Sequence, residues 1–166
     1  VVSSCCPDVI INCTAFHRLS DCETMPMKAL RMNAIAPTYM ASWCASAGAT
    51  FVHFSTDYVF DGSGGREPFA ECNPWFLSPL QVYGQSKRIG EQMIFTVNPK
   101  AVVIRTASLF GKAGSSGKGG NFVETVLKKM RAGEDMEVVN DVIMSPTSTV
   151  DLATPDGSAI PIEQRP

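Results

Sequence analysis

The stretch ATFVHFSTDYVFDG, residues 49–62, decides the fold. Its first half, residues 49–55, is a continuous run of apolar, β-branched and aromatic side chains. Such a run predicts a strand that is covered on both faces, as in a parallel sheet. A polar segment, Ser55-Thr56-Asp57, follows at once. Because ligands of open parallel sheets bind outside the carboxyl ends of the strands, we expect a binding site at this point.

Strand and helix patterns alternate along the rest of the chain. Strands are expected at residues 9–12, 49–55, 100–105 and, more briefly, 137–139. Helices are expected within residues 21–47, over 81–97 and 121–131, and after Ser145-Pro146-Thr147. This alternation predicts an α/β fold in which helices flank a parallel sheet.

Glycines and prolines divide these elements. Pro26 and Pro37 interrupt the first helical region, so we expect a short helix followed by a longer one that Gly48 ends. Loops are expected at residues 61–66, 67–79 and 111–120, and residues 154–166 read as an unstructured tail.

Composition narrows the classes of function. The chain has 166 residues, 45% hydrophobic and 18% charged, with a net charge of −2, which is typical of a globular domain. The absence of a basic cluster disfavours nucleic-acid binding. No apolar run has the roughly 20 residues needed to cross a bilayer, and the first residues lack the pattern of a signal peptide. We therefore expect a cytoplasmic protein with neither a nucleic-acid nor a membrane partner.

Cysteines and histidines are scattered. The six cysteines form no CxxC pair, so we expect reduced, mostly buried thiols rather than a disulfide framework. His17 and His53 are too isolated to indicate a metal site, and none is expected.

Tyr83 and Lys87 could form a proton-transfer pair with Thr56. Residues four apart are neighbours on one helix face, and a nearby ammonium favours phenolate and lowers a tyrosine pKa. Thr56 could then hold a carbonyl oxygen while Tyr83 donates a proton and a cofactor supplies hydride. By itself YxxxK is a weak motif that an ordinary surface Tyr and Lys would also show, but a Ser-Thr at a predicted strand end about 27 residues upstream strengthens it. Likewise, the small residues Cys13-Thr14-Ala15 could admit a ligand or simply pack under a helix.

Several motifs in one order make a resemblance specific. They are Pro7-Asp8-Val9-Ile10-Ile11-Asn12, Asn33-Ala34, STDYVFDG at 55–62, YGQSK at 83–87, Arg105-Thr106, Asn121-Phe122-Val123 and Ser145-Pro146-Thr147. From about residue 7 to 153 the chain resembles the extended short-chain dehydrogenase/reductases, most closely the dTDP-4-dehydrorhamnose reductases (the RmlD-like substrate-binding family). The resemblance implies a Rossmann-like parallel sheet that lacks its first strand–helix units and the end of the substrate domain.

The resemblance also implies roles for individual residues. Thr56, Tyr83 and Lys87 would be catalytic. Contacts to NADPH or NADH would come from Cys13, Thr14, Ala15, Asn33, Ser55, Tyr83 and Lys87. Contacts to a nucleotide-sugar would come from Thr56, Tyr58, Tyr83, Ser108 and Asn121. Related dehydratases carry Glu where this chain has Tyr58, which favours simple carbonyl reduction.

The chain departs from the family pattern in ways that bear on function. The glycine-rich dinucleotide motif is absent, and we expect it in a strand–helix unit preceding this sequence. His17, Leu19 and Ser108 replace a usual Thr, Val and Trp, which affects substrate identity. Residues 1–153 are expected to form a partial NAD(P)-binding domain with the start of a substrate-binding region, in a homodimer.

Two functions remain open on the sequence. The first is NAD(P)H-dependent reduction of the 4-keto group of a nucleotide-linked deoxysugar, in dTDP-rhamnose-type biosynthesis. The second is a non-catalytic regulatory or binding subunit, resembling the methionine adenosyltransferase regulatory subunit, or an inactive truncated fragment.

Overall fold

The computed structural model describes residues 2–63, 69, 77–111 and 120–154. The chain divides into two compact units, one ending at Arg105 and the other beginning at Thr106. Each unit is described by itself. The expected loops at 67–79 and 111–120 and the expected tail lie largely outside the described residues.

The first unit is built on a parallel sheet. Its strands are β1 (Val9–Asn12), β2 (Thr50–Thr56) and β3 (Val102–Thr106), in the order β1-β2-β3. β1 and β2 run parallel, in a register that pairs Val9 with Thr50 and Asn12 with His53. Three of the four expected strands and the Rossmann-like α/β class are confirmed, with strand ends shifted by no more than two residues.

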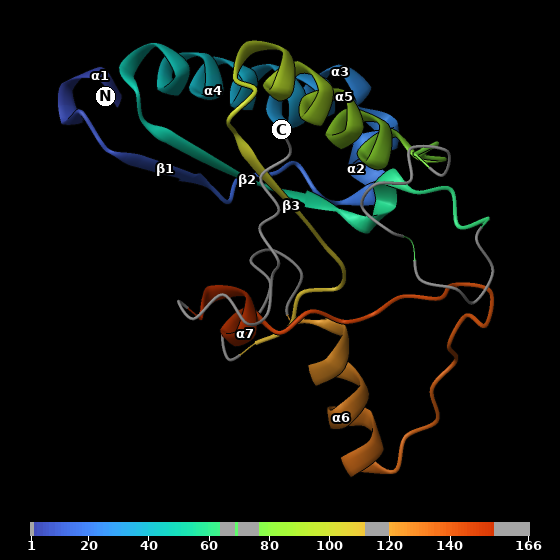
Figure 1. Cartoon of the computed structure of the whole chain (residues 1–166). Coiled ribbons are helices and arrows are strands. Elements are labelled where there is room, and N and C mark those ends of the chain that lie inside the picture. The colour runs from blue at the N-terminus through green and yellow to red at the C-terminus, as the bar shows by residue number, and fades with distance from the viewer. Residues whose placement is uncertain (1, 64–68, 70–76, 112–119, 155–166) are drawn as a thin grey trace. The chain divides into compact units, whose positions relative to one another are not determined.

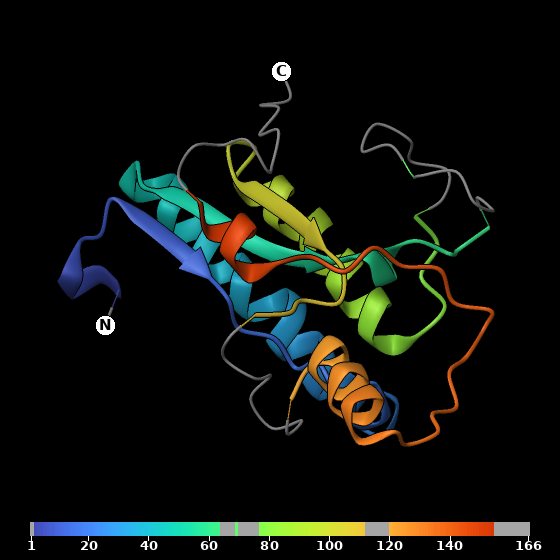
Figure 2. The same cartoon turned by 90° about the horizontal axis from the view of Figure 1, so that it is seen from below.

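Helices cover one face of this sheet. In Figure 1, α4 and α5 lie above the strands, and the rotated view shows them behind β2 and β3 (Figure 2). The elements of this unit besides the strands are α1 (Val2–Cys5), α2 (Leu19–Thr24), α3 (Pro26–Leu30), the π-helical turn η1 (Arg31–Ile35), α4 (Ala36–Ala47), the 3-10 turn η2 (Asp57–Val59) and α5 (Val82–Val97).

The two prolines interrupt the helical region as the sequence predicts. The region differs from the prediction because two short helices and a π turn, rather than one short helix, precede the longer helix α4. Pro26 opens α3, and Pro37 lies in the first turn of α4, directly after η1. Proline has no N–H to donate, and the wider π turn before it adapts the helix to that loss. Gly48 ends α4 in the left-handed conformation, with φ of 72°.

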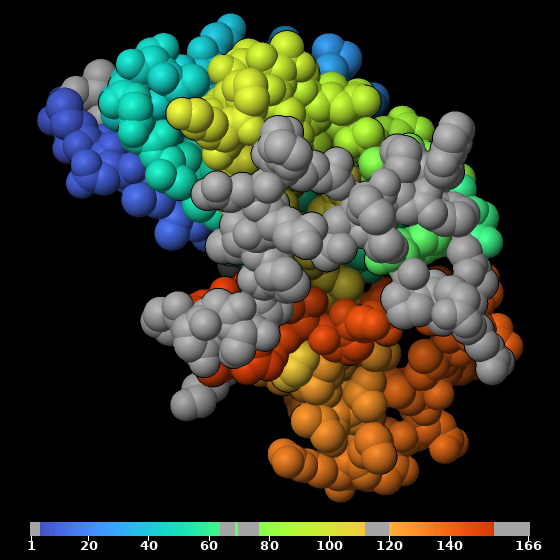
Figure 3. Space-filling view, viewed as in Figure 1, coloured from blue at the N-terminus to red at the C-terminus, as the bar shows by residue number. Residues whose placement is uncertain are grey.

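The core lies between the sheet and helices α4 and α5. Phe51 of β2, Ile94 of α5 and Cys44 of α4 are fully buried and pack in one cluster. The two helices run side by side in the space-filling view (Figure 3). Burial of aromatic and aliphatic side chains supplies most of the free energy that stabilises such a layer.

β1 is covered on one face only, although its continuous apolar run is typical of a strand covered on both faces. Val9 and Ile11 of β1 are 50% and 59% exposed, because the described helices cover only the other face of this edge strand. The cysteines also differ from expectation. The described ones are free thiols, but Cys5, Cys6 and Cys13 are exposed, while Cys22 and Cys44 are buried.

The second unit holds α6 (Phe122–Ala132) and α7 (Thr149–Ala153). Asn121 caps α6: its side-chain oxygen accepts the N–H of Glu124 at 2.9 Å, and the Glu124 carboxylate accepts the N–H of Asn121. Gly133 ends the helix in the left-handed conformation, with φ of 65°. The strand expected at 137–139 is wrong, because this segment is irregular and Val138 and Val139 are exposed.

Candidate active site

The carboxyl ends of β1 and β2 meet at one edge of the sheet. Asn12, the last residue of β1, is paired with His53, so Cys13-Thr14-Ala15 and Ser55-Thr56 follow at the same edge. The Asn12 side-chain oxygen accepts the backbone N–H of Thr14 at 3.1 Å and its hydroxyl at 2.7 Å. These bonds turn the chain sharply after the strand and leave Cys13 and Thr14 exposed.

Asn33 ties the next part of this loop to α5. Its side-chain oxygen accepts the N–H of Phe16 at 2.8 Å, and its amide donates to the Phe16 carbonyl and to the Ser86 hydroxyl, both at 2.9 Å. The side chain is fully buried. Asn33 was expected to contact the cofactor. Its polar atoms instead bind protein groups, so it holds the loop after β1 in place.

Helix α5 brings Tyr83 and Lys87 against β2. The helix begins after Gln81, and the N–H of Val82 donates to the Glu23 carboxylate at 2.9 Å. Tyr83 meets Tyr58 edge to face, with ring centroids 5.9 Å apart. A methyl group at Gly84 would overlap the Tyr58 carbonyl oxygen, so only glycine lets η2 approach the helix this closely.

Tyr83 and Thr56 are brought together, as the sequence predicts. Burial raises the pKa of Tyr83 to about 12, although a hydrogen bond with the Thr56 side chain works against this rise. The lowered pKa expected from a neighbouring ammonium is therefore wrong. The physical reasons are that the phenol is desolvated and that Lys87 is engaged elsewhere.

Lys87 is only 1% exposed and binds two groups of β2. Its Nζ lies 2.9 Å from Nε2 of His53 and donates to the Phe54 carbonyl at 2.5 Å. Burial lowers the pKa of Lys87 to about 8, while the nearby Glu91 acts in the opposite direction. Burial and Lys87 lower the pKa of His53 to about 3, so its imidazole is neutral.

Glu91, one turn beyond Lys87, is buried and paired with arginines. Arg105 donates to its two carboxylate oxygens at 2.9 and 2.7 Å, and Arg88 donates at 3.1 Å. Burial alone would raise the pKa of Glu91, but these partners and Ser55 lower it below its ordinary value. Arg105 also lies over the Phe60 ring, 5.3 Å from its centroid.

The turn η2 orders the polar segment that follows β2. Thr56 accepts the N–H of Tyr58 at 3.3 Å and donates to the Asp57 carboxylate at 3.1 Å. Burial raises the pKa of Asp57, against the hydrogen bond from Thr56. The Thr56 hydroxyl is thus held between Asp57 and Tyr83.

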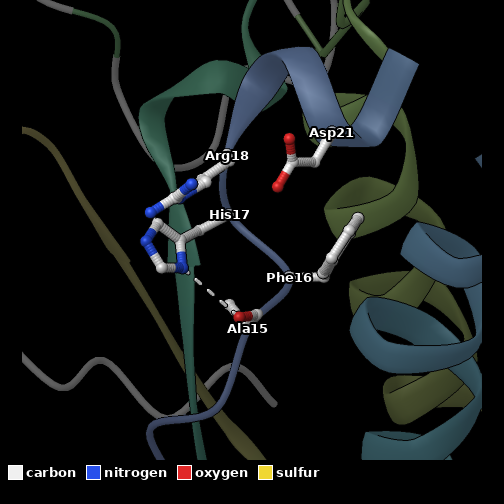
Figure 4. Close-up of a pocket in the computed structure, with 5 residues that line it drawn as sticks. All are labelled: Ala15, Phe16, His17, Arg18 and Asp21. Atoms are coloured by element: carbon white, nitrogen blue, oxygen red, sulfur yellow. Dashed lines mark hydrogen bonds between the residues drawn. The ribbon is translucent and has the colours of Figure 1, made fainter. Parts of the chain in front are cut away.

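A small pocket lies on the segment after β1. Ala15, Phe16, His17, Arg18 and Asp21 line it (Figure 4). His17 Nδ1 lies 3.4 Å from the Ala15 carbonyl. The pocket therefore adjoins the segment whose small residues the sequence singled out.

Two expected substrate contacts lie in the second unit. Ser108 has a positive φ of 32°, and its hydroxyl donates to the Met144 sulfur at 2.6 Å. Asn121 caps α6, as described above. Their role toward a substrate stays a prediction.

Sequence reasoning missed Asn12, His53 and Glu91. His53 was set aside as isolated, yet it lies two residues from Phe51 and from Ser55, on the face of β2 that α5 covers. Strand alternation could have placed it there. Its contact with Lys87 depends on tertiary packing, which no local pattern reports.

Over the described residues, no cluster of three or more potential metal ligands occurs. In that same part of the chain, no helix has both the length and the apolar content to span a bilayer.

Comparisons with known proteins show what the chain as a whole resembles. The chain is 42% identical over 147 residues to the spore coat polysaccharide biosynthesis protein SpsK of Bacillus subtilis, covering 89% of this chain and 49% of that protein. It is 40% identical over 148 residues to the dTDP-4-dehydrorhamnose reductase of Mycobacterium tuberculosis H37Rv, covering 88% and 47%. The chain thus spans about half the length of these relatives.

Solved structures give the same result. A dTDP-4-dehydrorhamnose reductase of Bacillus anthracis in complex with NADP superposes with a TM-score of 0.80 at 35% identity, over 91% of this chain and 51% of that one. The orthologue from Clostridium acetobutylicum superposes with a TM-score of 0.79 at 38% identity, over the same shares. The RmlD substrate binding domain family matches residues 1–160. Because this family matches nearly the whole chain, the chain belongs to the RmlD substrate binding domain family.

Proposed function

We propose that this chain carries the catalytic centre of an oxidoreductase that uses NADPH or NADH to reduce the 4-keto group of a nucleotide-linked deoxysugar. The reaction would be that of a dTDP-4-dehydrorhamnose reductase, in dTDP-rhamnose-type biosynthesis. Relatives named dTDP-4-dehydrorhamnose reductase and dTDP-4-keto-6-deoxy-D-glucose reductase support this proposal. So does the similar enzyme whose structure contains NADP.

The contact between Tyr83 and Thr56 at the end of β2 carries the proposal. When a hydride reduces a carbonyl, a general acid must protonate the oxygen, and a phenol with a pKa raised to about 12 holds such a proton at neutral pH. We propose that the Thr56 hydroxyl, which contacts the phenol, turns its proton from Asp57 toward the same carbonyl oxygen and orients it. As the oxygen gains negative charge, Tyr83 transfers its proton to it and Thr56 stabilises it.

The donor set at the sheet edge fits a dinucleotide. Cys13 and Thr14 are exposed, and Ala15 has no side chain beyond its methyl group, so a ligand can approach the backbone after β1. Ser55 and Lys87 lie at the end of β2 and on α5, and we propose that they complete the contacts. When bound, the nicotinamide would supply the hydride.

The proposal also includes contacts to the nucleotide-sugar. We assign Tyr58, Ser108 and Asn121 to it, together with Thr56 and Tyr83. The absence of Glu at position 58 favours reduction over elimination. We also propose that residues 1–153 form a partial NAD(P)-binding domain with the start of a substrate-binding region. The protein would be cytoplasmic and would form a homodimer.

The decisive variant is Tyr83→Phe. It removes one hydroxyl from a ring that stays packed against Tyr58, so we expect NADPH binding to persist while turnover falls roughly 10²–10⁴-fold. NADPH and NADH are titrated by fluorescence, and oxidation is then followed with a dTDP-4-keto-6-deoxy sugar.

A matched control is Tyr39→Phe, which removes a hydroxyl from an exposed tyrosine of α4 and should leave both readouts unchanged. Turnover that survives Tyr83→Phe would overturn the mechanism. Tight NADPH binding with no turnover by the unaltered protein would favour a binding or regulatory role instead.

A further inference from the structure

The first turn of α5 carries Tyr83, but the residue before it is not one that usually caps a helix. That residue is Gln81 rather than Ser, Thr, Asp or Asn, and no acidic side chain lies in the turn itself. In the described part of the chain, the Gln81 side chain makes no bond to the turn. The first N–H groups of an α-helix have no partner within the helix, so this turn needs an acceptor from elsewhere.

Glu23 of α2 supplies such an acceptor. Its Oε1 accepts the N–H of Val82, the first residue of α5, at 2.9 Å and across 59 residues of sequence. A carboxylate at this place completes a hydrogen bond and also faces the positive end of the helix dipole. The two helices are in contact, and α2 lies beside the first turns of α5 (Figure 1). Glu23 therefore caps α5 from another element.

A second set of bonds holds the other side of the same turn. Ser86 donates to the Tyr83 carbonyl at 2.8 Å and accepts from the Asn33 amide at 2.9 Å. Asn33 also binds the N–H and the carbonyl of Phe16, and that carbonyl accepts the Cys22 thiol at 3.3 Å. Cys22 is fully buried and directly precedes the capping glutamate. The backbone on both sides of Tyr83 is thus bonded to the segment that leads into α2 or to α2 itself.

We propose that Glu23 is a positioning residue for Tyr83. By bonding the first N–H of α5, it fixes the turn that holds the phenol against Thr56. Helix ends fray when their terminal groups lack partners, and a frayed turn would take the phenol away from Thr56 and from the Tyr58 ring. The role assigned to Glu23 rests on the proposed reductase function, because it serves the same proton transfer.

Three substitutions of Glu23 separate a hydrogen-bond acceptor from a simple charge. Glu23→Gln is neutral but keeps an oxygen acceptor at the same reach, whereas Glu23→Asp keeps the charge and is one methylene shorter. Glu23→Ala removes both. Because the side chain is exposed, none of these changes disturbs the core. We expect Glu23→Gln to retain the contact and Glu23→Asp to lose it, and an effect of charge alone would give the reverse order.

Two readouts need neither cofactor nor substrate. The chain has three tyrosines, so their ring signals can be followed by NMR in tyrosine-labelled protein. The signals of Tyr83 and Tyr58, whose rings meet edge to face, should move in Glu23→Asp and Glu23→Ala. They should keep their positions in Glu23→Gln, and the signal of Tyr39 should not move in any variant. Exchange of the Val82 amide should accelerate roughly 10-fold in the two variants that lose the contact, while amides of β2 stay protected.

Kinetics test the consequence for the reaction. We expect kcat to fall roughly 10-fold in Glu23→Ala and Glu23→Asp with KM for NADPH unchanged, because the phenol is misplaced while the cofactor contacts remain. Glu23→Gln should restore kcat, which a loss of folded protein could not explain. Glu134→Ala, which removes an exposed carboxylate in the second unit, should change neither parameter.

Tyrosine signals that stay in place in both Glu23→Asp and Glu23→Ala would overturn the proposal, as would a Glu23→Gln variant that behaves like Glu23→Ala. If Glu23→Ala fails to fold, the comparison of Glu23→Asp with Glu23→Gln decides. Absence of turnover in the unaltered protein would count against the proposed reductase function. The ring signals and the Val82 amide would still show whether Glu23 holds Tyr83 in place.

Discussion

Glu91 is the buried negative charge beside the candidate catalytic centre. Its side chain is inaccessible to solvent, while that of Arg105 is 23% exposed. A buried carboxylate is costly unless it is paired and hydrogen-bonded, and the two-point bond from Arg105 meets that condition. The pair joins α5 to β3, so it fixes the helix that carries Tyr83 and Lys87.

Glu91→Gln should therefore destabilise the first unit by about 2–3 kcal/mol, the usual contribution of charged hydrogen bonds. Because the folded pKa of Glu91 lies below its ordinary value, its stabilisation is present above about pH 4 and is lost as pH falls through the folded pKa. Urea unfolding between pH 7 and pH 3 should show a smaller acid-dependent loss in Glu91→Gln than in the unaltered protein.

Arg88→Gln is the matched control at this site. Its side chain is 25% exposed and makes one bond to Glu91 within the same helix, so its loss should cost at most about 1 kcal/mol. Equal costs for Arg88→Gln and Glu91→Gln would contradict the central role given to the Glu91–Arg105 pair.

At the scale of elements, the contact between α5 and η1 depends on a glycine. A methyl group at Gly90 would overlap the carbonyl oxygen of Asn33 and approach Ala34 Cα to 3.2 Å. Both are backbone atoms, which cannot rotate away as a side chain can. The close approach in turn lets Asn33 reach Phe16 and Ser86.

Gly90→Ala should therefore be destabilising, although alanine is the better helix former by about 1 kcal/mol. We expect a net loss of about 1–3 kcal/mol in urea unfolding, because α5 must move away from η1. Gln92→Ala, at an exposed position of the same helix, should stay within about 0.5 kcal/mol. A Gly90→Ala variant as stable as Gln92→Ala would show that the two elements separate freely.

The elements that sequence reasoning predicted correctly are those with a strong local signal. β2 and α5 show apolar runs or helical periodicity over many residues, and the ends of α4 and α6 coincide with Gly48 and Gly133. Residues 137–139 were predicted as a strand because Val138 and Val139 are β-branched. A high β-propensity forms a strand only where another strand lies beside it to pair with. Residues 137–139 are irregular despite their propensity.

The site could be predicted only in part, for a related reason. Thr56, Tyr83 and Lys87 were predicted as site residues because their spacing forms a motif. Other polar partners at this edge of the sheet lie far away in sequence: His53 is 34 residues from Lys87 and 41 from Asn12. Even the direction of the Tyr83 pKa shift depends on burial, which only the packed structure provides.

At the scale of the whole molecule, burial is unevenly distributed between the two units. The buried hydrophobic cluster comes entirely from residues before Thr106, whereas α6 and α7 contain no buried residue. On α6, Phe122, Leu127 and Met130 are 54%, 45% and 70% exposed. A helix whose apolar face is exposed gains little free energy from packing, so its stability rests on its caps.

Amide hydrogen exchange on the full chain should reveal this difference. We expect the amides of α4, α5 and β2 to exchange only by opening of the first unit as a whole, and those of α6 to exchange through local opening. The protection factors should differ by roughly 100-fold or more, equal to about 3 kcal/mol. Asn121→Ala, which removes the α6 cap, should lower α6 protection further by about 1 kcal/mol and leave α5 unchanged. Protection of α6 equal to that of α5 would mean that both units unfold as one cooperative body, because local opening of a capped but unburied helix could not produce it.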